Sequence, residues 1–248
     1  MIGRRDVLRR LLALIPAGGF LSSLIGAASA EGATPQEDTH GVSYGMGIDL
    51  DKCIGCGRCM VACKTENDVP DHPFYYRTWV ERYSISTNDE VSVEAIAMEG
   101  SQGQPFEEQN ILRSFFVPKL CNHCAKPPCV QVCPVGATFS TDDGVVLVDH
   151  ERCMGCRYCI QACPYGARFF NPESATADKC SFCYHRLDKG LLPACVEVCP
   201  TQARVFGDSN SIASPLTRFK RTNKIHVLKP ELNTEPKVLY ANLDGEVR

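Results

Sequence analysis

The sequence predicts an α+β fold of short strands, short helices and tight loops, in which the same unit occurs more than once. Three observations predict it. The 248-residue chain carries 16 cysteines, and all of them fall into four groups of four. Residues 51–63 are matched one hundred residues later by 151–163, and residues 127–139 are matched by 193–206. Between the groups, alternating apolar runs are bounded by turn residues, as in strands and hairpins.

The cysteine groups follow a regular spacing. The first and third read Cys-x2-Cys-x2-Cys-x3-Cys, and the other two have a longer middle interval. Three closely spaced thiolates can surround one side of a small inorganic cube, and a [4Fe–4S] cluster takes four thiolates. The count therefore predicts four [4Fe–4S] clusters, with the ligands Cys53, Cys56, Cys59 and Cys63; Cys121, Cys124, Cys129 and Cys133; Cys153, Cys156, Cys159 and Cys163; Cys180, Cys183, Cys195 and Cys199.

Residues next to the cysteines agree with this interpretation. Gly55 lies inside the first group, where a tight turn must bring backbone close to a bound cube. A proline follows the last cysteine of three groups, at Pro134, Pro164 and Pro200. Lys64 stands at that position in the first group, which is a departure from the pattern, but the spacing that makes Cys63 a ligand is intact.

Other chemistries of cysteine remain as alternatives. Disulfides are common in exported cysteine-rich chains, and structural zinc also uses Cys-x2-Cys pairs. The repeated spacing favours cubes over both. No Cys-x2-Cys-His sequence for covalent haem occurs, and there is no nucleotide, flavin or nucleophile motif. An iron–sulfur enzyme would usually leave one iron without a cysteine, whereas every cube here can be fully ligated, so we expect a non-catalytic chain that moves single electrons.

The segments between and after the groups predict the remaining elements. In chain order these are a strand at 44–53 entering the first group, two strands within 74–98 joined by a turn at 87–90, a polar loop at 101–110, a run at 115–120 leading into the second group, a hairpin at 141–153 with its turn at Asp143-Gly144, a short helix at 212–220 and a late strand at 237–243.

With these motifs the chain resembles the four-cluster iron–sulfur subunits of molybdopterin oxidoreductases and related quinone-linked membrane complexes. Members serve polysulfide, tetrathionate and formate-dependent nitrite reduction, and one is the exported subunit of the transmembrane complex associated with sulfite reduction. The resemblance covers roughly residues 44–206 by motif spacing. It implies two interleaved bacterial-ferredoxin-like modules, with a β-rich insertion at 71–115 and a C-terminal extension at 207–248; the first module would comprise 31–70 and 171–206, and the second 116–170.

The resemblance also implies that the ligands cross between groups. Each cube would take three cysteines from one group and the last cysteine of another. The four sets would be Cys53, Cys56, Cys59 and Cys199; Cys180, Cys183, Cys195 and Cys63; Cys121, Cys124, Cys129 and Cys163; Cys153, Cys156, Cys159 and Cys133. The implied partners are an integral-membrane subunit that interacts with quinone and a further redox subunit, either a molybdopterin enzyme or a cytochrome. A freely diffusing periplasmic ferredoxin and a zinc-stabilised interaction scaffold remain as alternative functions.

The N-terminus predicts export. Arg4 and Arg5 precede an uncharged apolar stretch that ends at Ala30 in an Ala-x-Ala-like cleavage site. The paired arginines resemble the twin-arginine signal, whose route exports folded proteins, and clusters could then be inserted before export. We therefore expect residues 1–30 to be a twin-arginine signal peptide and the mature chain to be periplasmic and peripheral on the membrane. An uncleaved anchor is the alternative.

Charge adds two expectations. Removing residues 1–30 takes away four arginines and one aspartate, which leaves 22 basic and 28 acidic residues and a formal net charge of −6. Such a chain is a poor candidate for nucleic-acid binding. Basic residues flank every cysteine group, and a cation near a cube would raise its potential by favouring the reduced state. These residues are Lys52, Arg58, Lys119, Lys126, Arg152, Arg157, Lys179 and Lys189.

Overall fold

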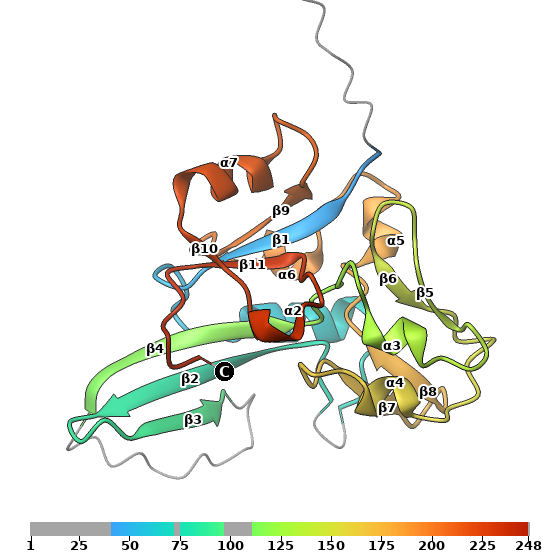
Figure 1. Cartoon of the computed structure of the whole chain (residues 1–248), viewed down its shortest axis with the longest axis horizontal. Coiled ribbons are helices and arrows are strands. Elements are labelled where there is room, and N and C mark those ends of the chain that lie inside the picture. Colours follow the sequence, from blue (N-terminus) through green and yellow to red (C-terminus); the bar gives the residue numbers. More distant parts are fainter. Residues whose placement is uncertain (1–40, 72–74, 97–110, 248) are drawn as a thin grey trace, which may run out of the picture. The chain divides into compact units, whose positions relative to one another are not determined.

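The computed structural model describes residues 41–71, 75–96 and 111–247, which all belong to one compact unit, and Figure 1 traces them. Helices and strands are mixed along the chain, as predicted for an α+β fold. The predicted signal peptide and the polar loop at 101–110 lie outside the described residues. In order, the elements are β1 (Tyr44–Asp49), α2 (Arg58–Glu66), β2 (Thr78–Ser86), β3 (Val91–Ala95), β4 (Ile111–Leu120), α3 (Pro128–Gln131), β5 (Thr138–Ser140), β6 (Val146–Val148), α4 (Tyr158–Gln161), β7 (Arg168–Asn171), β8 (Thr176–Lys179), α5 (Tyr184–Leu187), α6 (Ala194–Glu197), β9 (Arg204–Asp208), α7 (Pro215–Thr222), β10 (Ile225–His226), the 3-10 helix η2 (Pro230–Leu232) and β11 (Val238–Ala241).

The first strand lies inside a four-stranded sheet with the order β10-β11-β1-β9. Strand β1 pairs in parallel with β11 and antiparallel with β9, so the C-terminal segment is built into the same sheet as the entrance to the first cysteine group. The predicted helix at 212–220 and the late strand at 237–243 correspond to α7 and β11. Helix α7 packs on this sheet where Gly47 leaves room, because a Cβ there would lie 2.5 Å from the ring of Phe219.

A second sheet, with the order β3-β2-β4, is antiparallel throughout. Strands β2 and β3 are joined by residues 87–90, as the turn signal predicted. The long strands β2 and β4 run side by side in Figure 1, and Val80 and Val117 are buried on them. Strand β4 ends at Leu120 and therefore delivers the chain directly to Cys121.

Two small hairpins follow the second and third cysteine groups. The β5–β6 hairpin turns through Asp143 and Gly144, with Gly144 at φ 79°, as predicted. The β7–β8 hairpin was not predicted, because its segment has little apolar alternation. Its turn is held by the Asn171 side chain, whose Oδ1 accepts a hydrogen bond from the backbone N–H of Glu173 at 2.9 Å.

The helices that follow the cysteine loops differ in length for a local reason. Helices α3, α4 and α6 have four residues each, and in each case a proline follows the last cysteine of the group. Proline disfavours helical backbone at the residue before it and offers no N–H. Lys64 removes this restriction, and α2 continues for nine residues to Glu66. The departure from the proline pattern therefore lengthens one helix.

The main hydrophobic core includes cysteines as well as ordinary apolar residues. Tyr240, Phe182, Met46 and Ile48 are fully buried in it, and Cys59, Cys121, Cys180 and Cys195 belong to the same cluster of buried side chains. The thiols are thus continuous with the core. None of the helices in the described ranges has the length and apolar character needed to cross a bilayer.

Candidate cluster-binding sites

The four cysteine loops share one backbone feature. The residue before the second cysteine of each group has a positive φ: 68° at Gly55, 41° at His123, 70° at Gly155 and 54° at Phe182. Only glycine adopts this conformation without cost, and at His123 and Phe182 it is stored strain of the kind that collects at functional sites. The same turn is therefore made four times, in two groups with glycine and in two without.

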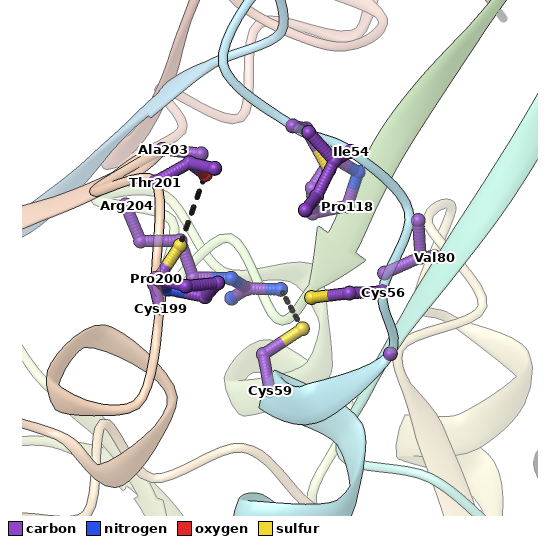
Figure 2. A pocket seen from close by; sticks show the side chains of 12 residues that line it. Ile54, Cys56, Cys59, Val80, Pro118, Cys199, Pro200, Thr201, Ala203 and Arg204 are labelled. Atoms are coloured by element: carbon purple, nitrogen blue, oxygen red, sulfur yellow. Dashed lines mark hydrogen bonds between the residues drawn. The ribbon is translucent and has the colours of Figure 1, made fainter.

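The first set of thiols surrounds a cavity, which Figure 2 shows from close by. Its lining includes Cys53, Cys56 and Cys59 from the first group and Cys199 from the fourth. Arg204 donates from Nη2 to Cys59 Sγ at 3.5 Å, and the hydroxyl of Thr201 lies 3.8 Å from Cys199 Sγ. The cavity thus brings together four sulfurs with hydrogen-bonding partners beside two of them.

The second set surrounds a smaller cavity. It is lined by Cys180, Cys183 and Cys195 from the fourth group and by Cys63 from the first. Asn67 donates from Nδ2 to both Cys63 Sγ and Cys183 Sγ, each at 3.6 Å. Burial and the nearby thiolates of the fourth group raise the pKa of Cys63 well above its usual value. An iron ion that replaces these protons would relieve that repulsion.

In the third set, the pKa of one cysteine indicates which thiolates lie near it. Burial, together with the thiolates of Cys121, Cys129 and Cys163, raises the pKa of Cys124 to about 11 against the lowering effect of a hydrogen bond from Thr234. Cys163 belongs to the third group, so the last cysteine of that group lies within electrostatic reach of Cys124 and Cys129 of the second group.

In the fourth set, two packed helices relate the last cysteine of the second group to the third group. Cys159 lies in α4 and Cys133 follows α3, and these two helices pack on each other as α2 and α6 do in the first two sets. Burial alone would raise the pKa of Cys133, but backbone N–H groups, including that of Thr138 at 3.5 Å from Sγ, outweigh it and lower the pKa. The link between Cys133 and the third group thus rests on the packing of these two helices.

The surroundings of the thiols fit iron–sulfur cubes. All sixteen cysteines are free of disulfides. Val146 donates its N–H to Nδ1 of the buried His123, so the proton of this imidazole is on Nε2, on the side of Cys180. Asn122 Nδ2 and Arg168 Nε are buried without a partner. Sulfide and thiolate sulfurs of a bound cube are acceptors for such donors.

A single metal ion fits less well. Within the described ranges, no three side chains of His, Cys, Asp or Glu lie close enough together to hold one ion. The thiols of the first two sets are spread around a cavity instead, which is the arrangement that a cube with four iron corners requires.

The basic residues singled out from the sequence differ in their environment. Lys52 pairs with Asp49 at 3.2 Å, Lys126 with Glu235 at 2.6 Å and Arg152 with Asp149 at 3.3 Å. Lys119 pairs with Glu81, and the guanidinium of Arg157 lies over the ring of Phe170, while Arg58 and Lys189 are exposed. Lys179 alone among the eight is buried. Most of these charges are therefore neutralised or solvated locally.

Two buried arginines were missed by the sequence reasoning. Arg168 and Arg204 open strands β7 and β9, each five residues after the last cysteine of its group. Arg168 donates from Nη2 to Cys129 Sγ at 3.0 Å, as Arg204 does to Cys59. An alignment of "GARFF" at 166–170 with "QARVF" at 202–206 would have found both, because the Ala-Arg pair recurs at the same offset.

Solvent reaches the four groups unequally. Cys56 and Cys156 are exposed, and so are the apolar side chains beside them, Ile54 at 58% and Met154 at 64%. The corresponding cysteines of the second and fourth groups are buried. Two cube positions therefore face solvent and two lie inside.

Known proteins similar to this chain carry the same motifs. Two family models, each described as a 4Fe-4S dicluster domain, match residues 52–137 and 112–209. A tetrathionate reductase subunit of Salmonella typhimurium is 45% identical over 243 residues, which cover 97% of this chain and 88% of that protein. The arsenate respiratory reductase iron-sulfur subunit ArrB of a Shewanella strain is 35% identical, covering 81% of this chain and 97% of that protein. Protein NrfC of Escherichia coli is 38% identical, covering 80% of each.

Proposed function

Because the chain belongs to the iron–sulfur electron-transfer subunits of oxidoreductase complexes, with four [4Fe–4S] clusters and no catalytic role of its own, we propose that it relays single electrons through interleaved ligand sets. In this arrangement each cube takes three cysteines from one group and the last cysteine of another. The protein's part is to hold, space and tune the cubes, and the cubes supply the redox chemistry.

One observation carries the proposal. Cys63, which follows the first group's trio, lines the cavity of Cys180, Cys183 and Cys195, and Cys199 lines the cavity of the first group. A reciprocal exchange of this kind joins two neighbouring cubes by one short helix each. It supports the interpretation of residues 31–70 and 171–206 as one two-cluster, ferredoxin-like module and of residues 116–170 as the other, with 71–115 as an insertion and 207–248 as an extension.

The two solvent-facing positions suit the ends of the relay. An electron must enter and leave at cubes that a partner can approach, and Cys56 and Cys156 mark such positions in the first and third groups. The buried second and fourth groups would then carry the electron between them. The partners that we propose are a quinone-interacting membrane subunit at one end and a molybdopterin enzyme or cytochrome at the other.

The cellular setting is part of the proposal. The paired arginines support export of the folded, loaded chain to the periplasm, where it would be held on the membrane by its partner. Two of the relatives are named as subunits of tetrathionate reductase, which supports a role in sulfur-compound respiration.

Purification of the affinity-tagged chain with its native partners from anaerobically grown cells tests the function. We expect it to co-purify from the membrane fraction with a membrane subunit and a second redox subunit, and to be reduced or oxidised by a quinol or quinone only in that assembly. Recovery from the periplasm as a single loaded chain, without partners, would contradict the proposal and favour a freely diffusing ferredoxin.

A further inference from the structure

Three cations are buried without a carboxylate to neutralise them. Lys179, Arg168 and Arg204 are each 5% exposed or less. None of the ion pairs among the described residues includes any of the three. A buried charge without a counter-ion is strongly destabilising, so folded proteins pair it. The surroundings of these residues must therefore supply negative charge from another source.

Arg204 faces the first and the fourth cysteine groups. Its Nη2 donates to Cys59 Sγ at 3.5 Å (Figure 2). The same nitrogen donates to the hydroxyl of Thr78 at 2.8 Å. Burial alone would lower the pKa of Arg204, but the thiolates of Cys59 and Cys195 outweigh it and raise the pKa. The guanidinium thus lies within electrostatic reach of ligands to two proposed cubes.

Lys179 faces the fourth and the second groups. It is the residue before Cys180, and its Nζ donates to the main-chain oxygens of Val146 and Cys180. Burial and the nearby guanidinium of Arg168 lower the pKa of Lys179, and the thiolates of Cys121, Cys180 and Cys129 oppose that effect. The ammonium therefore connects the two buried groups.

Arg168 faces the second and the third groups. Its Nη2 donates to Cys129 Sγ at 3.0 Å, and its Nη1 donates to Thr138 at 3.3 Å. The thiolates of Cys129, Cys121 and Cys159 outweigh the effect of burial and raise the pKa of Arg168. Cys159 is a ligand of the third group.

We propose that these three side chains are the counter-ions of the clusters and that one lies between each pair of consecutive cubes, so that each raises the reduction potential of both its neighbours. The order is first group, Arg204, fourth group, Lys179, second group, Arg168, third group. The proposal rests on the relay proposed above. A fixed positive charge in a low-dielectric interior stabilises the more negative, reduced cube on either side, and this effect is larger than that of a solvated charge.

The chain offers a matched control for Lys179. A cation also precedes the first cysteine of two other groups, at Lys52 and Arg152. Both side chains are largely exposed, at 56% and 71%, and both pair with an aspartate. Removal of these charges changes the local sequence in the same way but leaves no buried site empty.

The test is a redox titration followed by electron paramagnetic resonance on the loaded full-length chain, compared among Lys179→Met, Lys52→Met, Arg152→Met and Arg168→Gln. For Lys179→Met we expect the ratio of reduced to oxidised cube at a fixed ambient potential to fall at least tenfold, a shift of about 59 mV for a one-electron couple, at the second-group and fourth-group cubes. Arg168→Gln should shift the second-group and third-group cubes instead. The two surface variants should change every ratio by less than threefold.

Equal potentials in Lys179→Met and the wild type, or an equal shift of all four cubes, would overturn the proposal, and neither result would affect the cube count on which the relay depends. If a neutral variant does not bind its full iron and sulfide, the charge-retaining variants Arg168→Lys and Lys179→Arg show whether loading requires the charge or the shape of the side chain. We expect these two to load fully, with potentials within threefold of the wild-type ratios. Failure of the charge-retaining variants to load would show that side-chain shape rather than charge is required, and would also overturn the proposal.

Discussion

Replacement of Gly155 by alanine tests the geometry of a cluster loop most sharply. Gly155 has a φ of 70°, and an added Cβ would lie 2.6 Å from the main-chain oxygen of Ala175 and 3.3 Å from the ring of Phe170. The left-handed conformation costs an alanine about 1–2 kcal/mol. Contact with a backbone atom cannot be relieved by turning a side chain, and overpacking of this kind costs about 1–3 kcal/mol. We expect a total of about 2–5 kcal/mol.

Gly166→Ala is the matched control, because Gly166 has a φ of 63° but nothing within 4 Å of an added Cβ. Only the backbone term should apply there, about 1–2 kcal/mol. Loss of clusters is irreversible, so the assay is the half-life of visible cluster absorbance in guanidinium under anaerobic conditions. If the whole difference of about 1–3 kcal/mol acts on the unfolding rate, the half-life of Gly155→Ala should be about five- to hundredfold shorter than that of Gly166→Ala. Equal half-lives for the two variants would refute the loop geometry.

Three further predictions follow from the ligand sets, the N-terminus and the surface of α2. Cys63→Ala should abolish the paramagnetic signal of the fourth-group cube, whereas Cys53→Ala should abolish a different one; loss of the same single signal in both would contradict the crossing. Substitution of Arg4 and Arg5 together by lysine should leave loaded precursor in the cytoplasm, as cell fractionation would detect, and normal export would instead favour general secretion or an anchor. Glu66→Gln should destabilise the folded chain by less than about 1 kcal/mol, because this carboxylate accepts hydrogen bonds from a histidine and an arginine of α5. These bonds lower the pKa of Glu66. The stabilisation by this carboxylate should therefore be complete above the usual carboxyl pKa and should be lost as the pH falls through the pKa of Glu66 in the folded chain. The variant should be less stable to guanidinium than the wild type near neutral pH and should match it only at the lowest pH.

Much of the fold near the cysteines could be predicted because local rules determine it. Strand β1, the β2–β3 turn, the Asp143-Gly144 hairpin, α7 and β11 all follow from apolar alternation or turn residues within a few positions. The partner strands of β1 could not be predicted in this way. Strand β11 pairs with it across about 190 residues, and neither sequence carries a signal for the other. The β7–β8 hairpin was missed because its turn depends on one asparagine side chain.

In the candidate sites, too, some features follow from the local sequence and others depend on the complete fold. Spacing alone identifies the sixteen cysteines, since a cube needs closely spaced thiolates. Burial of the neighbouring charges depends on the complete fold, which is why Lys52 and Lys179 look alike in sequence but differ in the structure: one pairs with Asp49 at the surface, and the other is enclosed between two groups. The repeated Ala-Arg pair marks Arg168 and Arg204 in the sequence, but the sulfurs that they contact lie 39 and 145 residues away, so the contacts themselves depend on the complete fold.

A reductive titration of the anaerobically purified chain, with iron and acid-labile sulfide measured on the same sample, tests the central claim most directly. Four [4Fe–4S] cubes predict about sixteen iron and about sixteen sulfide per chain and an uptake of about four electrons. Stoichiometric zinc without sulfide, or an uptake of about two electrons by a chain with its full iron content, would contradict a four-cluster relay.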